Sequence, residues 1–205
     1  MFDTLPKHSY GAILADPPWR FRTWDKSNVV GKVKGSARPG HGVAAYHYRT
    51  MSIEGIRALP VGELCLDDAA LFLWISWPNL LDALSVVEAW GFTFKTCAFC
   101  WIKAHAGQIE LFRDDLPDQM GLGYWTRANS EVCLLATRGD PKRKARDVRQ
   151  AIIEPRREHS RKPACVRGRI ERLVDGPYLE LFARTPSSSW SVWGNETDKF
   201  AEAAE

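Results

Sequence analysis

The sequence predicts an α/β fold, with a mostly parallel sheet and helices on both of its faces. Three observations predict this fold. Five short apolar runs have the composition of buried strands, amphipathic helical patterns lie between them, and the runs lack the strict alternation of a half-exposed sheet. The chain has 205 residues, of which 45% are hydrophobic and 26% are charged, and this is enough for a full core. We therefore expect one domain over residues 1–205.

The expected strands are rich in branched and aromatic residues. They cover residues 10–15, 71–75, 94–102, 132–137 and 178–183. Three segments carry apolar residues at helical spacing, and these are 52–59, 79–90 and 163–174. In the second of them we place Leu80, Leu81, Leu84 and Val87 on one face, and Gly91 marks the end of the helix. Strands that alternate with helices favour parallel pairing.

Two long segments have no regular pattern. Residues 22–43 combine four glycines with basic side chains, and residues 104–123 mix glycine, proline and charge. Loops of this length are uncommon in a compact domain and are usually functional or disordered. We interpret both segments as mobile loops that cover a ligand, with an insertion of no function as the alternative.

The sequence contains no apolar run that approaches the roughly 20 residues of a membrane span, and its start does not resemble a signal peptide. We therefore expect a cytoplasmic protein. The five cysteines lack the density of a disulfide scaffold, so we expect reduced thiols. Cys97 and Cys100 form a C-x-x-C pair, but no second pair or nearby histidine completes a zinc site. We expect this pair to pack within a strand and expect no metal.

The basic residues are unevenly distributed. A net charge of +3 is too small to indicate a nucleic-acid partner. Residues 138–172, however, hold thirteen Lys and Arg against five acids, a net charge of +8 over 35 residues. Such clusters are typical of surfaces that bind phosphate. A solvated face is the alternative interpretation.

The tetrapeptide Asp16-Pro17-Pro18-Trp19 directly follows the first predicted strand. In open α/β sheets, ligands bind beyond the carboxyl ends of the strands. With proline near 5% of average usage and tryptophan rarer, this order arises by chance in fewer than roughly one in a thousand chains of this length. The tetrapeptide is therefore our candidate for the functional centre, and a simple Pro-Pro turn is the alternative.

Further motifs accompany the tetrapeptide along nearly the whole chain. They are ADPPW at 15–19, YRTMSIEGIRALP at 48–60, LFLWISWPNLLDAL at 71–84, AWGFTFKT at 89–96, GYWTRANSEVCLLATRG at 123–139, EPRREHSRKP at 154–163, GPYLELFAR at 176–184 and WSVWGNE at 190–196. With these motifs the chain resembles the family of the seventy-kilodalton adenosine methyltransferase subunit (MT-A type), which are N(6)-adenine methyltransferases. The resemblance is greatest to the short bacterial and phage members.

The resemblance implies a Rossmann-like methyltransferase fold that uses S-adenosylmethionine as cofactor and releases S-adenosylhomocysteine. It also implies a permuted order of motifs, in which the catalytic DPPW comes early and the cofactor-binding strand, residues 178–183, comes late. That order explains why no G-x-G-x-x-G follows the first strand. Neither a metal ion nor a covalent nucleophile is implied.

The same resemblance implies roles for individual residues. The catalytic residues would be Asp16, Pro17, Pro18 and Trp19, and the cofactor contacts would be Asp16, Lys162, Glu180, Arg184, Asn195 and Glu196. The contacts to the target base would be Tyr48, Lys103, Trp125, Arg127 and Glu131. Lys162 has the charge to meet the methionyl carboxylate, and Arg184 and Asn195 carry donors for ribose or adenine.

Simpler roles stay open for some of these residues. Glu180 could be the polar end of a buried strand, Arg184 a surface charge, and Tyr48 and Trp125 core aromatics. Residues 129–130, Asn-Ser, depart from the family pattern, which leaves the contacts to the base edge open.

The chemistry of an adenine amino group explains why such a tetrapeptide suits this reaction. The nitrogen lone pair is delocalised into the ring, so acceptors must hold the amino hydrogens while the nitrogen becomes tetrahedral. The Asp16 carboxylate can accept one N–H and oppose the developing positive charge, and the Pro17 carbonyl can accept another. Prolines fix φ and remove competing backbone donors. Trp19 offers a flat face on which a base could stack.

Three other interpretations stay open. One is a non-catalytic nucleic-acid-binding subunit of the same fold, although the intact DPPW argues against it. Another is methylation of cytosine, for which related enzymes usually place serine where Asp16 stands. The third is an RNA adenine methyltransferase; we favour DNA because the short format resembles that of phage enzymes. The sequence leaves open the recognition sequence, the preference for single or double strands, and a homodimer.

Overall fold

The computed structural model describes residues 2–20, 50–104, 125–126, 128–155, 157–158 and 161–200. The two segments that we interpreted as mobile loops, 22–43 and 104–123, lie outside these ranges except for Ala104, which ends a strand. That interpretation therefore stays a prediction.

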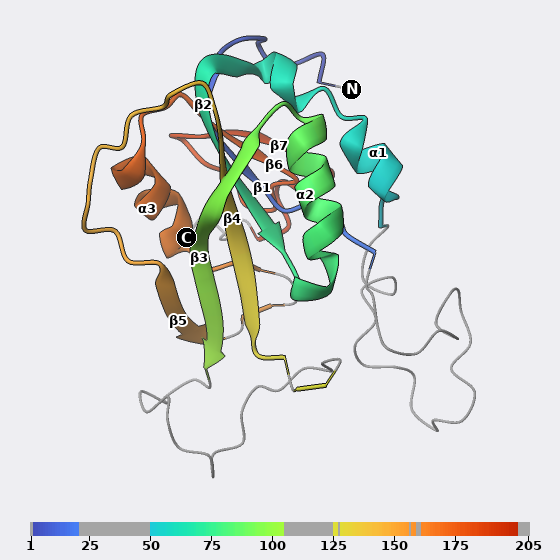
Figure 1. The fold of residues 1–205 in the computed structure, drawn as a ribbon, viewed down its shortest axis with the longest axis vertical. Helices are drawn as coiled ribbons and strands as arrows, with labels where there is room; N and C mark the ends of the chain where they lie inside the picture. The colour runs from blue at the N-terminus through green and yellow to red at the C-terminus, as the bar shows by residue number, and fades with distance from the viewer. Residues whose placement is uncertain are drawn as a thin grey trace.

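The described strands form one seven-stranded sheet in the order β5-β3-β4-β2-β1-β6-β7 (Figure 1). Their bounds are β1 Tyr10–Ala15, β2 Cys65–Ile75, β3 Thr93–Ala104, β4 Ser130–Arg138, β5 Ala151–Pro155, β6 Tyr178–Leu181 and β7 Ser191–Trp193. β4 pairs antiparallel with its neighbours β2 and β3, while every other described pair of strands is parallel. The sheet is therefore mixed, and β4 alone among its described strands opposes the rest.

Helices cover both faces of this sheet, as the sequence predicts. Their bounds are α1 Ile53–Arg57, α2 Leu80–Ala89 and α3 Cys165–Leu173, with short 3-10 helices at Val61–Leu64 and Trp77–Asn79. α1 begins after Ser52, whose Oγ accepts a hydrogen bond from the backbone N–H of Gly55 at 3.0 Å. α1 and α2 lie on one side of the sheet and α3 lies on the other (Figure 1).

Neighbouring residues of the central strands face two separate cores. Ile13 and Leu71 belong to the core under α1 and α2, whereas Leu14 and Phe72 belong to the core under α3. Because successive side chains of a strand point to opposite faces, both sets must be apolar when both faces are covered. This explains why the strand-like runs lack polar alternation.

Two strands, β5 and β7, were not predicted from the sequence. Both lie at the edges of the sheet, and β7 has only three residues. In β5 the burial alternates, with Ile152 buried and Ile153 exposed, so the segment lacks the apolar run that marks a central strand. The five predicted strands are confirmed. β1 has its predicted ends, β2 begins six residues earlier than predicted, and the ends of the other three shift by at most two residues.

The C-x-x-C pair lies in β3, as predicted. Cys97 and Cys100 are partly buried and pack against the core under α1 and α2. Burial raises the pKa of both thiols, which favours the neutral form. Within the described residues, no group of three or more His, Cys, Asp or Glu could hold a metal ion. None of the described helices has both the length and the apolar character needed to cross a membrane.

The pairing of β1 with β6 places the ends of two distant segments side by side. Ala15 and Leu181 are register partners at the carboxyl ends of these parallel strands. The backbone N–H of Asp16 donates to the carbonyl of Leu181 at 3.4 Å. The DPPW tetrapeptide therefore meets the chain that follows β6 at one edge of the sheet, where ligands of α/β proteins bind.

Candidate active site

The tetrapeptide after β1 is held by hydrogen bonds on both sides. The Pro17 carbonyl accepts the backbone N–H of Trp19 at 2.8 Å, and the Pro18 carbonyl accepts that of Met51 at 3.0 Å. The Trp19 indole N–H donates to the backbone carbonyl of Trp74 in β2 at 2.8 Å, and only 7% of Trp19 is exposed. Trp19 therefore anchors the loop to the sheet, and a stacking role for its ring stays a prediction.

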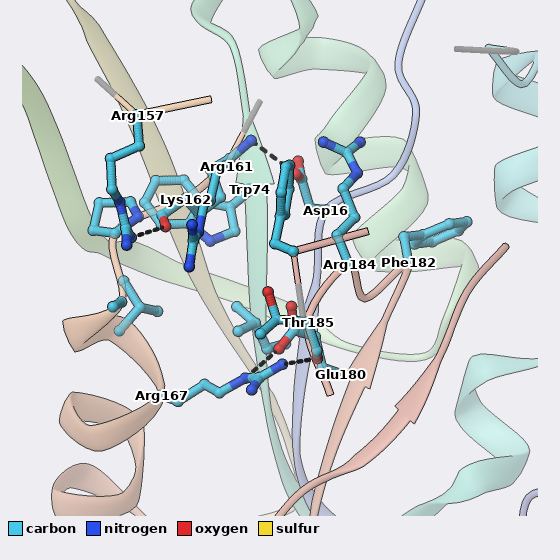
Figure 2. A pocket seen from close by; sticks show the side chains of 15 residues that line it. Asp16, Trp74, Arg157, Arg161, Lys162, Arg167, Glu180, Phe182, Arg184 and Thr185 are labelled. Carbon is cyan, nitrogen blue, oxygen red and sulfur yellow. Dashed lines mark hydrogen bonds and ion pairs between the residues drawn. The ribbon is translucent and has the colours of Figure 1, made fainter. Parts of the chain in front are cut away.

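A row of alternating charges crosses the carboxyl end of the sheet. The Lys162 Nζ lies 2.8 Å from Asp16 Oδ2 and 3.2 Å from Glu131 Oε2. The Glu131 Oε1 in turn lies 2.5 Å from the Nζ of Lys103. The Lys162 ammonium also lies over the Trp74 ring, 5.6 Å from its centroid (Figure 2). Lys162 therefore links Asp16 of the tetrapeptide to Glu131 of β4, and Glu131 in turn links β4 to Lys103 of β3.

Opposite charges in this row shift the pKa values of Glu131 and Lys162 toward their ionised forms. Burial alone would raise the pKa of Glu131, but the ammonium groups of Lys162 and Lys103 outweigh it and lower that pKa to about 2. Burial would likewise lower the pKa of Lys162, but the carboxylates of Asp16 and Glu131 raise it. Partly buried charges of this kind keep their ionised state because each has an opposite partner.

A cavity of about 630 Å³ opens beside Asp16. It is lined by Asp16, Pro18, Thr50, Met51, Phe182, Ala183, Arg184, Trp193, Asn195 and Glu196. The Arg184 Nε lies 3.6 Å from Glu196 Oε2, so this ion pair borders the cavity. The mixture of aromatic side chains with a few convergent polar groups, and the volume, are typical of sites for small molecules and cofactors.

Phe182 has a backbone conformation that is unusual for its residue type. Its φ is 61°, in the left-handed region, directly after β6. Side chains other than glycine seldom adopt this conformation, and it is enriched at functional sites. Its ring packs edge-on against Trp193 at 5.7 Å, and the residue lines the large cavity. The turn therefore places both aromatic residues in the lining of the large cavity.

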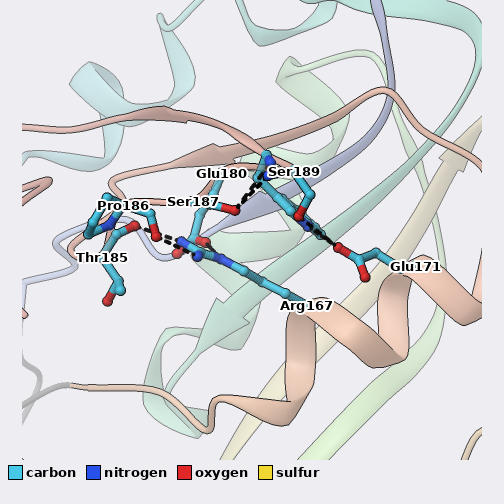
Figure 3. A network of polar contacts seen from close by, with 8 residues as sticks. Arg167, Glu171, Glu180, Thr185, Pro186, Ser187 and Ser189 are labelled. Carbon is cyan, nitrogen blue, oxygen red and sulfur yellow. Dashed lines mark hydrogen bonds and ion pairs between the residues drawn. The ribbon is translucent and has the colours of Figure 1, made fainter. Parts of the chain in front are cut away.

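Arg167 of α3 holds the far side of the same turn. Its Nε donates to Glu180 Oε2 at 2.6 Å, and its terminal nitrogens donate to the carbonyls of Thr185 at 2.8 Å and Pro186 at 3.2 Å (Figure 3). Burial raises the pKa of Glu180, and the guanidinium of Arg167 offsets only part of that effect. One turn further along the helix, Glu171 accepts the indole N–H of Trp190 at 2.7 Å. α3 therefore fixes the connection between β6 and β7.

Comparison with known proteins identifies the family. The family model described as MT-A70 matches residues 10–196. The chain belongs to the MT-A70 family. A relative from a Mycoplasma species, the type II methyltransferase M.MunI, is 31% identical over 203 residues, which cover 96% of this chain and 81% of the relative. The match confirms the resemblance inferred from the motifs, and the mixed seven-stranded sheet is consistent with the fold of this family.

Longer relatives contain the same region. An MT-A70-like N(6)-adenosine-methyltransferase of Arabidopsis thaliana is 26% identical over 92% of this chain, which spans 24% of that protein. The human N(6)-adenine-specific methyltransferase METTL4 is 24% identical over 95% of this chain, which spans 39% of that protein. This member of the MT-A70 family is therefore an adenine N6-methyltransferase, and the family implies S-adenosylmethionine as methyl donor.

The structure brings most of the predicted MT-A70 site residues to one edge of the sheet. Asp16, Lys162, Glu131 and Lys103 form the charge row, while Arg184, Asn195 and Glu196 border the large cavity. Glu180 lines a smaller adjoining cavity of about 150 Å³ (Figure 2). Trp125, a predicted contact of the target base, is 94% exposed and lines neither cavity. Tyr48 and Arg127 lie outside the described residues, so their roles stay predictions.

Sequence reasoning missed Arg167, Trp74 and Phe182. Arg167 resembles any charged residue on an amphipathic helix, and Trp74 lies within an apolar run that predicts only a buried strand. The one signal for Arg167 is indirect. A carboxylate such as Glu180 inside a predicted buried strand needs a cationic partner, and α3 is the segment that precedes that strand in the chain.

Proposed function

We propose that this chain transfers the methyl group of S-adenosylmethionine to the N6 amino group of adenine in DNA, with Asp16 at the reacting centre. The observation that carries the proposal is the convergence at Asp16 of the charge row, the large cavity and the smaller cavity. DNA is favoured because M.MunI, of which this chain spans 81%, is named a type II methyltransferase, a class of DNA-modifying enzyme.

We assign the large cavity to the cofactor, because its volume and lining fit a nucleoside with a charged amino-acid tail. Arg184, Asn195 and Glu196 would bond the ribose hydroxyls or the adenine edge, and Lys162 would meet the methionyl carboxylate. When bound, S-adenosylmethionine supplies a methyl group that its sulfonium has already activated. In this assignment the catalytic strand β1 comes first and the cofactor strand β6 comes late, which is the permuted order predicted from the sequence.

Asp16 would hold the target amino group. Lys162 takes its Oδ2, and among the described residues no hydrogen bond reaches its Oδ1. That oxygen is therefore available to accept one amino hydrogen, and the carboxylate opposes the positive charge that develops on nitrogen. The Pro17 carbonyl retains a second lone pair beside its bond to Trp19, so it can accept the other hydrogen. The proton that the nitrogen finally loses would leave through the Asp16 carboxylate.

The proposal predicts a specific product. We expect N6-methyladenine in DNA after the chain is incubated with S-adenosylmethionine, and less of it in matched RNA. Mass spectrometry of the nucleosides measures both. N4-methylcytosine would instead support the cytosine alternative, and a preference for RNA would overturn the choice of DNA. Binding of DNA without any methylated product would support the non-catalytic subunit. A cytoplasmic location, a single domain and a homodimer stay predictions of the sequence.

Arg167 supplies a test of the cofactor assignment. Its replacement by Met removes three hydrogen bonds from Glu180 and the turn after β6 while the bulk of the side chain is kept. We expect the affinity for S-adenosylmethionine to fall about tenfold, or about 1.4 kcal/mol, with a smaller change in affinity for DNA. Arg167→Lys should recover part of the loss, because it retains the charge beside Glu180.

Calorimetry measures the affinity, and Arg172→Met is the matched control. Arg172 lies on the same helix and pairs with Asp147 through exposed side chains, so its loss should leave cofactor binding unchanged. Equal effects of the two variants would show that α3 contributes only general stability to the site.

A further inference from the structure

Two groups of basic residues in the segment 138–172 lie at opposite ends of β1. The first group consists of Arg143, Lys144 and Arg146. In the first group Lys144 pairs with Asp175 at 2.9 Å, and its backbone N–H bonds the carbonyl of Leu173. Asp175 lies against Gly11 at the start of β1. A Cβ added at Gly11 would be only 3.0 Å from the carbonyl oxygen of Asp175. The six residues of β1 span roughly 20 Å from there to Asp16. The first group is therefore remote from the reacting centre.

The second group lines the smaller cavity that shares Asp16 with the larger one. Arg157, Arg161, Lys162 and Arg167 of this segment contribute positive charge to it, together with Arg184, which pairs with Glu196. Within the cavity Lys162 is paired with Asp16, and Arg167 is paired with Glu180. These two cations are thus neutralised by partly buried carboxylates.

Arg157 and Arg161 have no such partner inside the cavity. The Arg157 guanidinium donates to the Lys162 carbonyl at 3.0 Å, and its charge also acts on the exposed carboxylate of Glu158. Arg161 pairs with Glu158 at 3.0 Å, but the Glu158 side chain is 55% exposed, so water screens that pair. Figure 2 shows both arginines beside Lys162. The cavity therefore contains two guanidinium groups that can bind an anion.

We propose that Arg157 and Arg161 bind the backbone phosphate next to the target adenine, and that the first basic group does not contact the nucleic acid. This inference rests on the proposed function. When the target base reaches Asp16, the phosphates of the same nucleotide lie within one nucleotide length of Asp16. The first group is too far from Asp16 to contact them. A guanidinium also matches the geometry of a phosphate with two parallel hydrogen bonds.

The methionyl carboxylate of the cofactor is the other source of an anion at this place. That carboxylate is accompanied by an ammonium group, and a zwitterion suits a site with both signs of charge, such as Lys162 with Asp16. A phosphodiester carries negative charge without a cation of its own. It therefore fits Arg157 and Arg161, which lack a buried carboxylate.

The test compares two double variants that remove the same charge. Arg157→Gln with Arg161→Gln alters the cavity, and Arg143→Gln with Arg146→Gln alters the first group, where both side chains are exposed. The probe is a labelled, adenine-containing DNA duplex, titrated by fluorescence anisotropy between about 50 and about 200 mM salt. Because each phosphate contact contributes about 0.9 to the slope of log affinity against log salt, and both arginines are assigned to one phosphate, the cavity variant should lower that slope by about 1.

The expected affinity for DNA falls at least about tenfold at the lowest salt in the cavity variant and less than about twofold in the other. Calorimetric affinity for S-adenosylmethionine alone should stay within about twofold of the parent in both, which also shows that the cofactor site is folded. A loss of cofactor affinity in the cavity variant would assign these arginines to the methionyl carboxylate. An equal or larger effect of the Arg143 and Arg146 replacements would place the phosphates on the first group. Either result would overturn the inference.

The methylation assay on the unmodified chain separates this inference from the proposed function. If the unmodified chain makes no methylated adenine but the salt slope falls in the cavity variant, the phosphate site is supported and the proposed function is contradicted. If the unmodified chain methylates DNA but the salt slope is unchanged in the cavity variant, the proposed function is supported and the phosphate site is contradicted.

Discussion

Asp16→Asn is expected to fold, to bind S-adenosylmethionine, and to transfer methyl groups about 10²–10³ times more slowly than the parent. The amide oxygen can still accept one amino hydrogen, but the negative charge that opposes the developing positive nitrogen is absent. Lys162 keeps Glu131 as a partner at 3.2 Å, so the charge row is shortened and not abolished. Single-turnover methylation of an adenine-containing oligonucleotide measures the rate, and calorimetry measures cofactor binding separately.

Asp147→Asn is the matched control for this experiment. It makes the same chemical change at an exposed ion pair with Arg172, 2.7 Å long, at the other end of the sheet. Turnover of the control should equal that of the parent. Near-parental turnover by Asp16→Asn, or substantial turnover by Asp16→Ala, would contradict the role that we assign to Asp16.

The central strands and all three helices could be predicted from the sequence because their signal is local. β1, residues 69–75 of β2 and residues 132–136 of β4 are continuous apolar runs, and a strand that is buried on both faces must have that composition. β3 and β6 contain charged residues but keep enough branched and aromatic residues to mark them as strands. β5 and β7 could not be predicted, since an edge strand needs neither length nor continuous burial. The reversed direction of β4 was also invisible, because the direction of pairing leaves no mark in a buried strand.

The tetrapeptide could be found from sequence because it is rare and follows a strand. Its ion-pair partner could not be found in the same way, since Lys162 lies 146 residues later and nothing local distinguishes it from its basic neighbours. The motif resemblance identified it. The motifs likewise implied that Lys103 and Glu131 contact the target base, but in the structure both are bound into the row that holds Asp16. Their contacts with the target base stay a prediction.

This row makes Lys162 the residue whose loss should matter most for stability as well as for binding. In Lys162→Met the carboxylates of Asp16 and Glu131, which are 18% and 24% exposed, lose their shared cation. Removal of one partner from such a cluster destabilises a protein by up to about 3 kcal/mol. The methionyl carboxylate would also lose its partner, so we expect cofactor affinity to fall by about 1–3 kcal/mol. Urea unfolding and calorimetry measure the two effects.

The pH dependence of stability shows whether Lys162→Met acts through the lost charge of the row or through lost packing. In the parent, the pKa of Glu131 is lowered from 4.5 to about 2, so its pairing stabilises the fold above pH 4.5 and this contribution is lost as the pH falls toward 2. Without Lys162 the pKa of Glu131 rises, so the variant should be most destabilised above pH 4.5 and should approach the parent near pH 2. Lys162→Arg should preserve most of the stability and the pH profile. A loss of stability that is equal at every pH would mean that the Lys162 side chain acts through packing against Trp74 and not through its charge.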